Sequence, residues 1–106
     1  MTDVAKRCAG PIALGTVATT VYTVPAATTT VIRSLHVANE SAAAATFTVS
    51  IGVDAAGKRV FYNTNVGIAD AYDWTGNIVL ATGEVVQAYA SIGTALTLVV
   101  SGIETS

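Results

Sequence analysis

Residues 46–53 read TFTVSIGV, and this stretch decides the fold class because apolar and small polar side chains alternate along it. Its apolar members, which would all point to one side of an extended strand, are Phe47, Val49, Ile51 and Val53. Thr48 and Ser50 would point to the opposite side. A period of two residues is typical of a β-strand with one buried face. We therefore predict a strand over residues 46–53 whose apolar side lies in a hydrophobic core.

The segments around this strand show the same β pattern. The sequence DAAG at residues 54–57 predicts a turn, and residues 58–63 predict the returning strand of a hairpin. Threonine and valine, which favour pleated and half-buried surfaces, dominate the chain from Ala18 onward. Further strands are predicted at residues 19–24, 30–39, 77–81, 84–91 and 95–103.

Glycine-containing turns separate these strands. They are predicted at residues 75–76, 82–83 and 92–94. Residues 65–73 are less regular and predict a short strand around Val66 and Ile68 followed by a loop. About seven to eight short strands with such turns predict an all-β fold, either an antiparallel β-sandwich or a jelly-roll-like arrangement.

The first fifteen residues differ from the rest of the chain. They begin with a short charged segment and continue into the pair Gly10-Pro11. A glycine–proline pair favours an irregular path. We predict that residues 1–15 form an extended N-terminal arm and that residues 16–106 form a single β-sandwich domain.

Cys8 is the only cysteine, so no internal disulfide can form. We interpret it as a small structural residue of the arm. The alternative is a reactive thiol, because Lys6 and Arg7 beside it would slightly favour the thiolate.

The chain contains little charge for its apolar content, since 52% of its residues are hydrophobic and 11% are charged. Soluble domains have about 25% charged residues. We therefore expect a homo-oligomer, with a trimer favoured, whose flanks are covered by copies of itself or by a larger assembly. The five basic residues are too dispersed to neutralise several phosphates, so no nucleic acid partner is expected. No apolar run approaches the ~20 residues of a spanning helix and no signal-peptide pattern is present, so no membrane partner is expected.

No motif in the sequence indicates catalysis. His36 is the only histidine, and the Gly-x-Ser-x-Gly motif of a nucleophile elbow is absent. Asp70 and Asp73 lie three positions apart, where a calcium site is the alternative to two solvated carboxylates. We expect no enzyme activity, and we predict no catalytic, cofactor or metal site.

Tyr72 and Trp74 lie beside these aspartates in a predicted loop. There they fit an interface anchor or a sugar-stacking platform. The structural alternative is a tryptophan that plugs one end of the sandwich. The candidate interface residues, taken from the arm and this loop, are Lys6, Arg7, Pro11, Tyr72 and Trp74.

Four stretches resemble a family of small β-rich virion proteins of tailed bacteriophages. They are YTVPA at 22–26, the run 31–39 ending in LHVAN, Trp74 and Gly76 followed by IVL and Gly83-Glu84, and VSGIE at 100–104. Members tend to show a Tyr-x-x-Pro strand end, an Asn after the long strand, a hydrophobic-x-x-Gly-Asp/Glu turn and a closing Ser-Gly-x-Glu. Similar chains often have a glycine in the turn after the proline, where this chain has Ala26-Ala27-Thr28.

The resemblance implies a non-enzymatic structural subunit of the virion, assembled in the host cytoplasm. It favours a capsid decoration (cement) protein that stabilises the shell by binding between capsid subunits, with the major capsid protein or another virion protein as its partner. A tail, collar or fibre subunit is the alternative among structural proteins. From another class, a small carbohydrate-binding module built on the same sandwich is the alternative.

Overall fold

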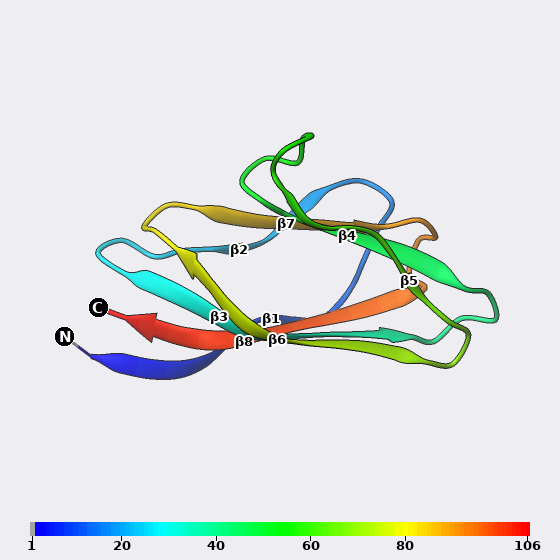
Figure 1. Cartoon of the computed structure of the whole chain (residues 1–106), viewed down its shortest axis with the longest axis horizontal. Coiled ribbons are helices and arrows are strands. Elements are labelled where there is room, and N and C mark those ends of the chain that lie inside the picture. The colour runs from blue at the N-terminus through cyan, green and yellow to red at the C-terminus, as the bar shows by residue number, and fades with distance from the viewer. Residues whose placement is uncertain (1) are drawn as a thin grey trace.

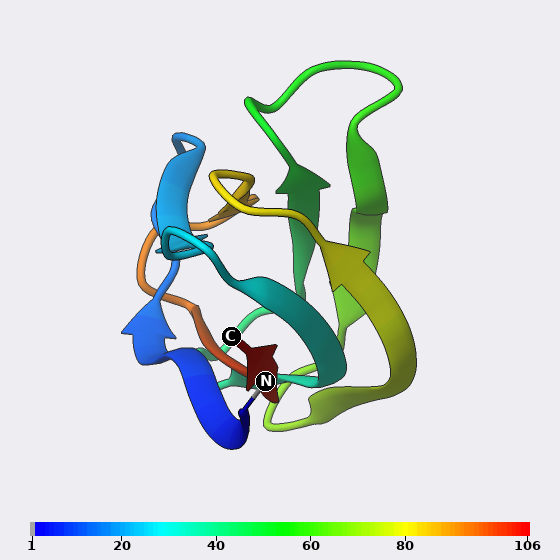
Figure 2. The same ribbon diagram turned by 90° about the vertical axis from the view of Figure 1, so that its left-hand side faces the viewer.

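The computed structural model describes residues 2–106, which form eight strands in two four-stranded antiparallel sheets (Figure 1). In chain order the strands are β1 (Asp3–Ala13), β2 (Thr19–Thr23), β3 (Thr29–Asn39), β4 (Ala45–Ile51), β5 (Arg59–Val66), β6 (Ala71–Leu80), β7 (Val85–Ala90) and β8 (Leu96–Thr105). The sheets lie face to face as a sandwich, which is seen from its end in Figure 2. Residues 2–106 contain no helix, and the predicted all-β sandwich is confirmed.

The strand order is that of one long two-stranded ribbon rolled into a sandwich. The turn after β4 leads into β5, and the pairing continues outward as β3 with β6, β2 with β7 and β1 with β8. The roll closes because β3 also pairs with β8, and β4 with β7. Sheet A has the order β1-β8-β3-β6 and sheet B the order β2-β7-β4-β5. This is the arrangement of an eight-stranded jelly roll.

Inward-facing side chains of both sheets form one hydrophobic core. Phe47 and Val49 of β4 are buried as predicted, with 1% and 2% of their surface exposed. The same cluster contains buried residues of sheet A, among them Ile32, Leu35, Val37, Leu96, Leu98 and Val100. Removal of this apolar surface from water is the main force that holds the sheets together.

The strand around Phe47 differs from the prediction at its end and on its outer face. β4 stops at Ile51, so the predicted inward position of Val53 is wrong, and 72% of Val53 is exposed in the turn. Gly52 lets the chain leave the strand there through a left-handed conformation with φ of +93°. Thr48 and Ser50 point away from the core but are only 1% exposed, because groups of the β4–β5 hairpin hydrogen-bond to them from outside.

The predicted N-terminal arm is wrong. Residues 3–13 form β1, the edge strand of sheet A, which pairs with β8. Two β-bulges in the second half of β1 each add one residue, so the alternation that marks a strand is lost from the sequence. Gly10 lies in this bulged region, where a Cβ would be 2.1 Å from the carbonyl oxygen of Leu98. The glycine that suggested an irregular arm is instead required by close strand pairing.

The predicted loop and turn before residue 77 are also wrong. β5 extends to Val66, and β6 runs without interruption from Ala71 to Leu80. Gly76 therefore lies within a strand, beside a register shift between β3 and β6. A Cβ at Gly76 would be 2.6 Å from the ring atom Cζ2 of Trp74. This glycine makes room for a neighbouring ring and does not form a turn.

Candidate interaction surfaces

Tyr72 and Trp74 belong to an aromatic group between the sheets. They lie on the inward side of β6, are half-buried, and contact Phe47 and Phe61 of sheet B. The ring centroids of the contacting pairs are 5.5–6.1 Å apart, in tilted or edge-to-face geometry. Such pairs contribute about 0.5–1.5 kcal/mol each beyond simple burial. The placement fits the structural alternative for Trp74 more closely than a sugar platform in a loop.

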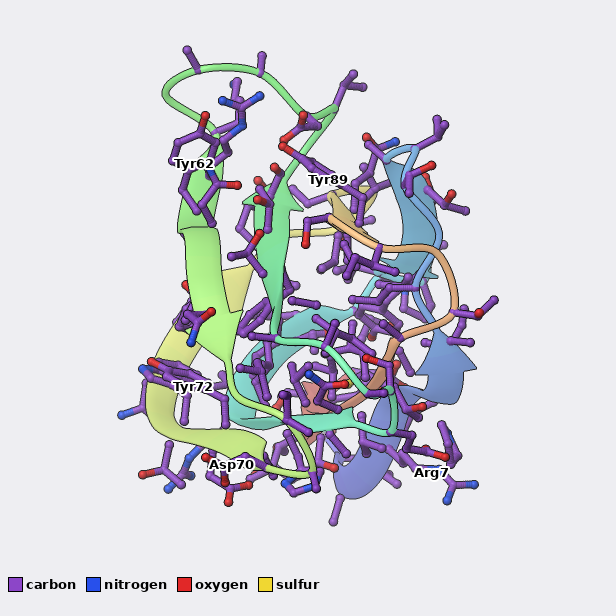
Figure 3. All side chains as sticks on the ribbon, turned by 90° about the vertical axis from the view of Figure 1, so that its right-hand side faces the viewer. Arg7, Tyr62, Asp70, Tyr72 and Tyr89 are labelled. Atoms are coloured by element: carbon purple, nitrogen blue, oxygen red, sulfur yellow. The ribbon has the colours of Figure 1, made fainter. Side chains whose placement is uncertain are left out.

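The five predicted interface residues do not come together. Lys6, Arg7 and Pro11 lie in β1 at one edge of sheet A, while Tyr72 and Trp74 lie in β6 at the other edge. Figure 3 shows Arg7 and Tyr72 on opposite sides of the molecule. They do not form one continuous surface, and an interface role for either group stays a prediction.

A polar cluster joins β1, β2, β3 and β8 at one end of the sandwich. The Tyr22 hydroxyl donates to Glu104 Oε2 and lies 2.7 Å from the Thr30 hydroxyl. Because Tyr22 has one hydroxyl proton, Thr30 donates in that second contact. Lys6 Nζ reaches the same Glu104 carboxylate at 3.2 Å. The cluster therefore ties the edge strand β1 to the centre of sheet A and to β2.

This cluster shifts the pKa of three groups. Burial, followed by the hydrogen bond to Glu104, raises the pKa of Tyr22 to about 12. The hydrogen bond from Tyr22, followed by that from Lys6, lowers the pKa of Glu104 below its usual range. Burial, with a contribution from the Glu104 charge, raises the pKa of the Cys8 thiol. The thiolate that Lys6 was expected to favour is thus disfavoured at Cys8.

The stretches that resemble phage virion proteins contain residues that hold neighbouring strands together. Besides the bond from Tyr22 to Glu104, the Val24 N–H donates to the Glu84 carbonyl at 2.9 Å, and the Gly83 N–H donates to the Val24 carbonyl at 3.2 Å. A Cβ at Gly102 would lie 2.2 Å from the Val31 carbonyl oxygen, so β3 and β8 can approach only because this residue is glycine. These contacts give the residues of the four stretches a structural role in this chain.

The outer face of sheet A is four strands wide and combines apolar and small residues with a polar strip. Residues that lie opposite one another on neighbouring strands form rows across the sheet. One row is apolar and consists of Ala5, Ile103, Val31 and Val79. Another consists of the small residues Ala13, Thr97, Ala38 and Ala71. Val79 is 66% exposed, so the apolar row ends in open solvent at β6.

The alternation of core residues does not by itself mark this face as a binding surface. Its residues alternate with the core residues of the same strands, and the signal that points to them is that two rows of this second face are also apolar or small. Between the two rows lie a polar row, Arg7-Ser101-Ser34-Thr75, and the residues Val99, His36 and Asp73. The His36 Nδ1 bonds to an Asp73 carboxylate oxygen.

A hydrogen-bonded network lies at the β4–β5 turn, at one end of sheet B. Arg59 binds the Asp54 carboxylate through two nitrogens, at 3.0 and 3.1 Å, and its guanidinium lies 4.7 Å from the centre of the Tyr62 ring. Ser50 donates to the same carboxylate, and the Asp54 N–H donates to Gln87 Oε1 at 3.0 Å. The bonds from Arg59 and Ser50 lower the pKa of Asp54. Figure 3 shows Tyr62 and Tyr89 at the end of the molecule that contains the β4–β5 turn, which this network stabilises.

The two aspartates considered for calcium have separate structural roles. Asp70 accepts a hydrogen bond from the Ala71 N–H at 2.8 Å in the turn between β5 and β6, and Asp73 pairs with His36. Within residues 2–106 there is no group of three or more His, Cys, Asp or Glu side chains arranged to bind a metal ion. The same residues enclose no pocket and include no helix long and apolar enough to cross a membrane.

No protein-family model, curated protein or solved structure matches this chain. The resemblance to phage virion proteins therefore stays a prediction based on the four stretches.

Proposed function

We propose that the chain is a structural subunit of a bacteriophage particle, and that within the virion it acts as a capsid decoration (cement) protein. The observation that supports this is the outer face of sheet A, four strands wide, on which an apolar row and a row of small side chains lie on either side of a polar strip. Large exposed apolar areas on a protein surface mark sites where another protein binds. Small side chains along a sheet also let a second surface approach closely.

In this proposal the chain stabilises the shell by binding alone. Copies lie with the outer face of sheet A across the joints between subunits of the major capsid protein. Any ligand that binds only the assembled state stabilises it by RT ln(1 + [L]/Kd), about 2.7 kcal/mol when the free ligand is at 100 times Kd. Many such sites on one shell add up. The rigid jelly roll keeps the ordering cost of each binding event low.

The chain would also self-associate, because its shortage of charge predicts a homo-oligomer with a trimer favoured. A tail, collar or fibre subunit uses the same face in the same way and differs in the particle that it joins. The carbohydrate-binding alternative requires an accessible Trp74 ring, but that ring lies against Gly76 and 5.6 Å from Phe61.

The test is co-sedimentation of the purified protein with phage shells prepared without it. Val79→Asp places a charge in the apolar row of sheet A and should weaken binding at least tenfold, because the carboxylate would lose water without gaining a partner. Val53→Asp is the matched control. It changes an equally exposed valine, 72% against 66%, in the β4–β5 turn.

Equal binding by the two variants would show that sheet A is not the docking face. Binding to isolated tails in place of shells would favour the tail or fibre alternative. Glycan binding that disappears in Trp74→Ala, together with no binding to any particle, would replace the proposal with the carbohydrate-binding module.

A further inference from the structure

One edge of β1 has no neighbouring strand in sheet A. β1 is the outermost strand of sheet A, and residues 2–7 are exposed. An edge strand presents backbone N–H and C=O groups without partners in its own sheet, which is where another strand can add. Residues 3–7 pair with β8 in regular register, since the first bulge comes after Arg7.

The hydrogen bonds to β8 identify which backbone groups face outward. Thr2 and Ser106 bond in both directions, at 2.7 and 3.0 Å, so the backbone groups of Thr2 point toward β8. In an antiparallel ladder, successive residues point alternately toward one neighbour and away from it. Asp3, Ala5 and Arg7 therefore direct their N–H and C=O groups to the free edge.

These three residues are self-complementary. We propose that two copies of the chain pair antiparallel through residues 3–7, about a two-fold axis at Ala5. Each Asp3 then lies opposite Arg7 of the other copy, and Ala5 lies opposite Ala5. All three residues are in hydrogen-bonded positions, which gives six backbone hydrogen bonds across the contact.

The charges select this register over its neighbours. Sliding one copy by two residues places Ala5 opposite Asp3 or Arg7, so the opposite charges no longer face each other. Sliding it by four places Asp3 opposite Asp3, or Arg7 opposite Arg7. Like charges directly opposite each other in a sheet are destabilising. Arg7 has no hydrogen bond or ion pair within residues 2–106, whereas Asp3 accepts a bond from Thr105 on the same face.

The pairing also extends the outer face of sheet A. The two four-stranded sheets become one eight-stranded sheet, and the apolar row that ends at Ala5 continues into the Ala5 row of the second copy. Closed two-fold pairing makes a dimer, whereas the sequence favoured a trimer. The contact requires only a second copy of this chain, so it does not depend on whether the chain belongs to a phage particle.

Sedimentation equilibrium or native mass spectrometry tests this, with an expected mass of twice the 10.7 kDa chain. Asp3→Arg and Arg7→Asp each create two like-charge contacts per dimer, and each should weaken dimerisation roughly tenfold or more. The double variant Asp3→Arg/Arg7→Asp restores opposite charges and should recover the dimer. Raising the salt from 0.15 to 1 M should weaken the wild-type dimer through screening of these exposed charges.

Ala5→Pro is a second test that does not depend on charge. The Ala5 N–H points away from β8, so proline should leave the intramolecular ladder intact and abolish the dimer. An unchanged melting temperature at low concentration confirms that this variant folds. A wild-type monomer at high micromolar concentration, a trimer insensitive to all of these changes, or a dimer that the single charge reversals leave intact would each overturn the proposal.

Discussion

Replacing Phe47 with alanine tests the core that the stretch at residues 46–53 predicted. The Phe47 side chain is 1% exposed, and its ring lies 5.5 Å from Tyr72 and 5.9 Å from Phe61. Truncation of a fully buried Phe costs about 3–5 kcal/mol through lost transfer free energy and an unfilled cavity. We expect the upper part of that range, because β4 is hydrogen-bonded on both sides and cannot move inward to fill the space.

The expected loss is large compared with the roughly 5–15 kcal/mol that holds a domain of this size together. It is measured by urea denaturation followed by far-UV circular dichroism, at one low protein concentration so that self-association does not contribute. Val53→Ala in the exposed turn is the control and should change the free energy of unfolding by less than about 0.5 kcal/mol. A loss below ~1 kcal/mol for Phe47→Ala, with an unchanged m-value, would refute the core placement of β4.

Three further predictions concern single backbone positions and one hydroxyl. Ala27 has φ of 54°, a left-handed conformation, in the turn where similar chains often have glycine. Ala27→Gly should therefore stabilise the fold by about 1 kcal/mol, because glycine adopts this conformation without strain. Ala26→Gly is the control and should not raise the melting temperature. Gly102→Ala should cost about 3 kcal/mol or more in denaturant titrations, because its Cβ would meet the Val31 carbonyl oxygen at 2.2 Å, whereas Gly15→Ala has open space and should be nearly neutral. The pKa of Tyr22, raised from 10 to about 12, means that the unfolded chain ionises first as the pH rises. Stability from this group should be complete below pH 10 and disappear toward pH 12, and Tyr22→Phe should remove that part of the alkaline decline in melting temperature.

The parts of the fold that the sequence predicted are those with uninterrupted alternation. β4 shows this best, because Phe47 and Val49 enter the core and the polar residues between them do not. β1 was missed because its two bulges displace the alternation. In β6, Gly76 resembles a turn residue until the Trp74 ring is placed beside it. Gly10 in β1 and Gly76 in β6 also share a difficulty, since a glycine required by a contact with another side chain or strand cannot be distinguished by sequence alone from one required by a turn.

The burial of Ser50 could not be predicted for a similar reason. A serine on the outer face of a sheet is expected to meet water, but the carboxylate of Asp54 folds back over it, held by two bonds from Arg59. This arrangement depends on how the hairpin tip closes and on Gln87 from another strand. The burial of Ser50 is therefore apparent only once the hairpin and its neighbouring strand are placed in three dimensions.

Residues that hold the fold together differ from residues that are available to bind a partner. Residues of the resembling stretches, among them Tyr22, Glu104 and Gly102, hold strands together. Asn39, 3% exposed at the end of β3, donates to the carbonyl of Val66 at the end of β5 and to that of Ala43 in the β3–β4 loop. These contacts hold the fold together, whatever the chain binds. The outer face of sheet A and the β1 edge are the surfaces proposed above for binding. Specificity for a partner therefore has to be tested at positions such as Val79 and Arg7, which the shared motifs do not include.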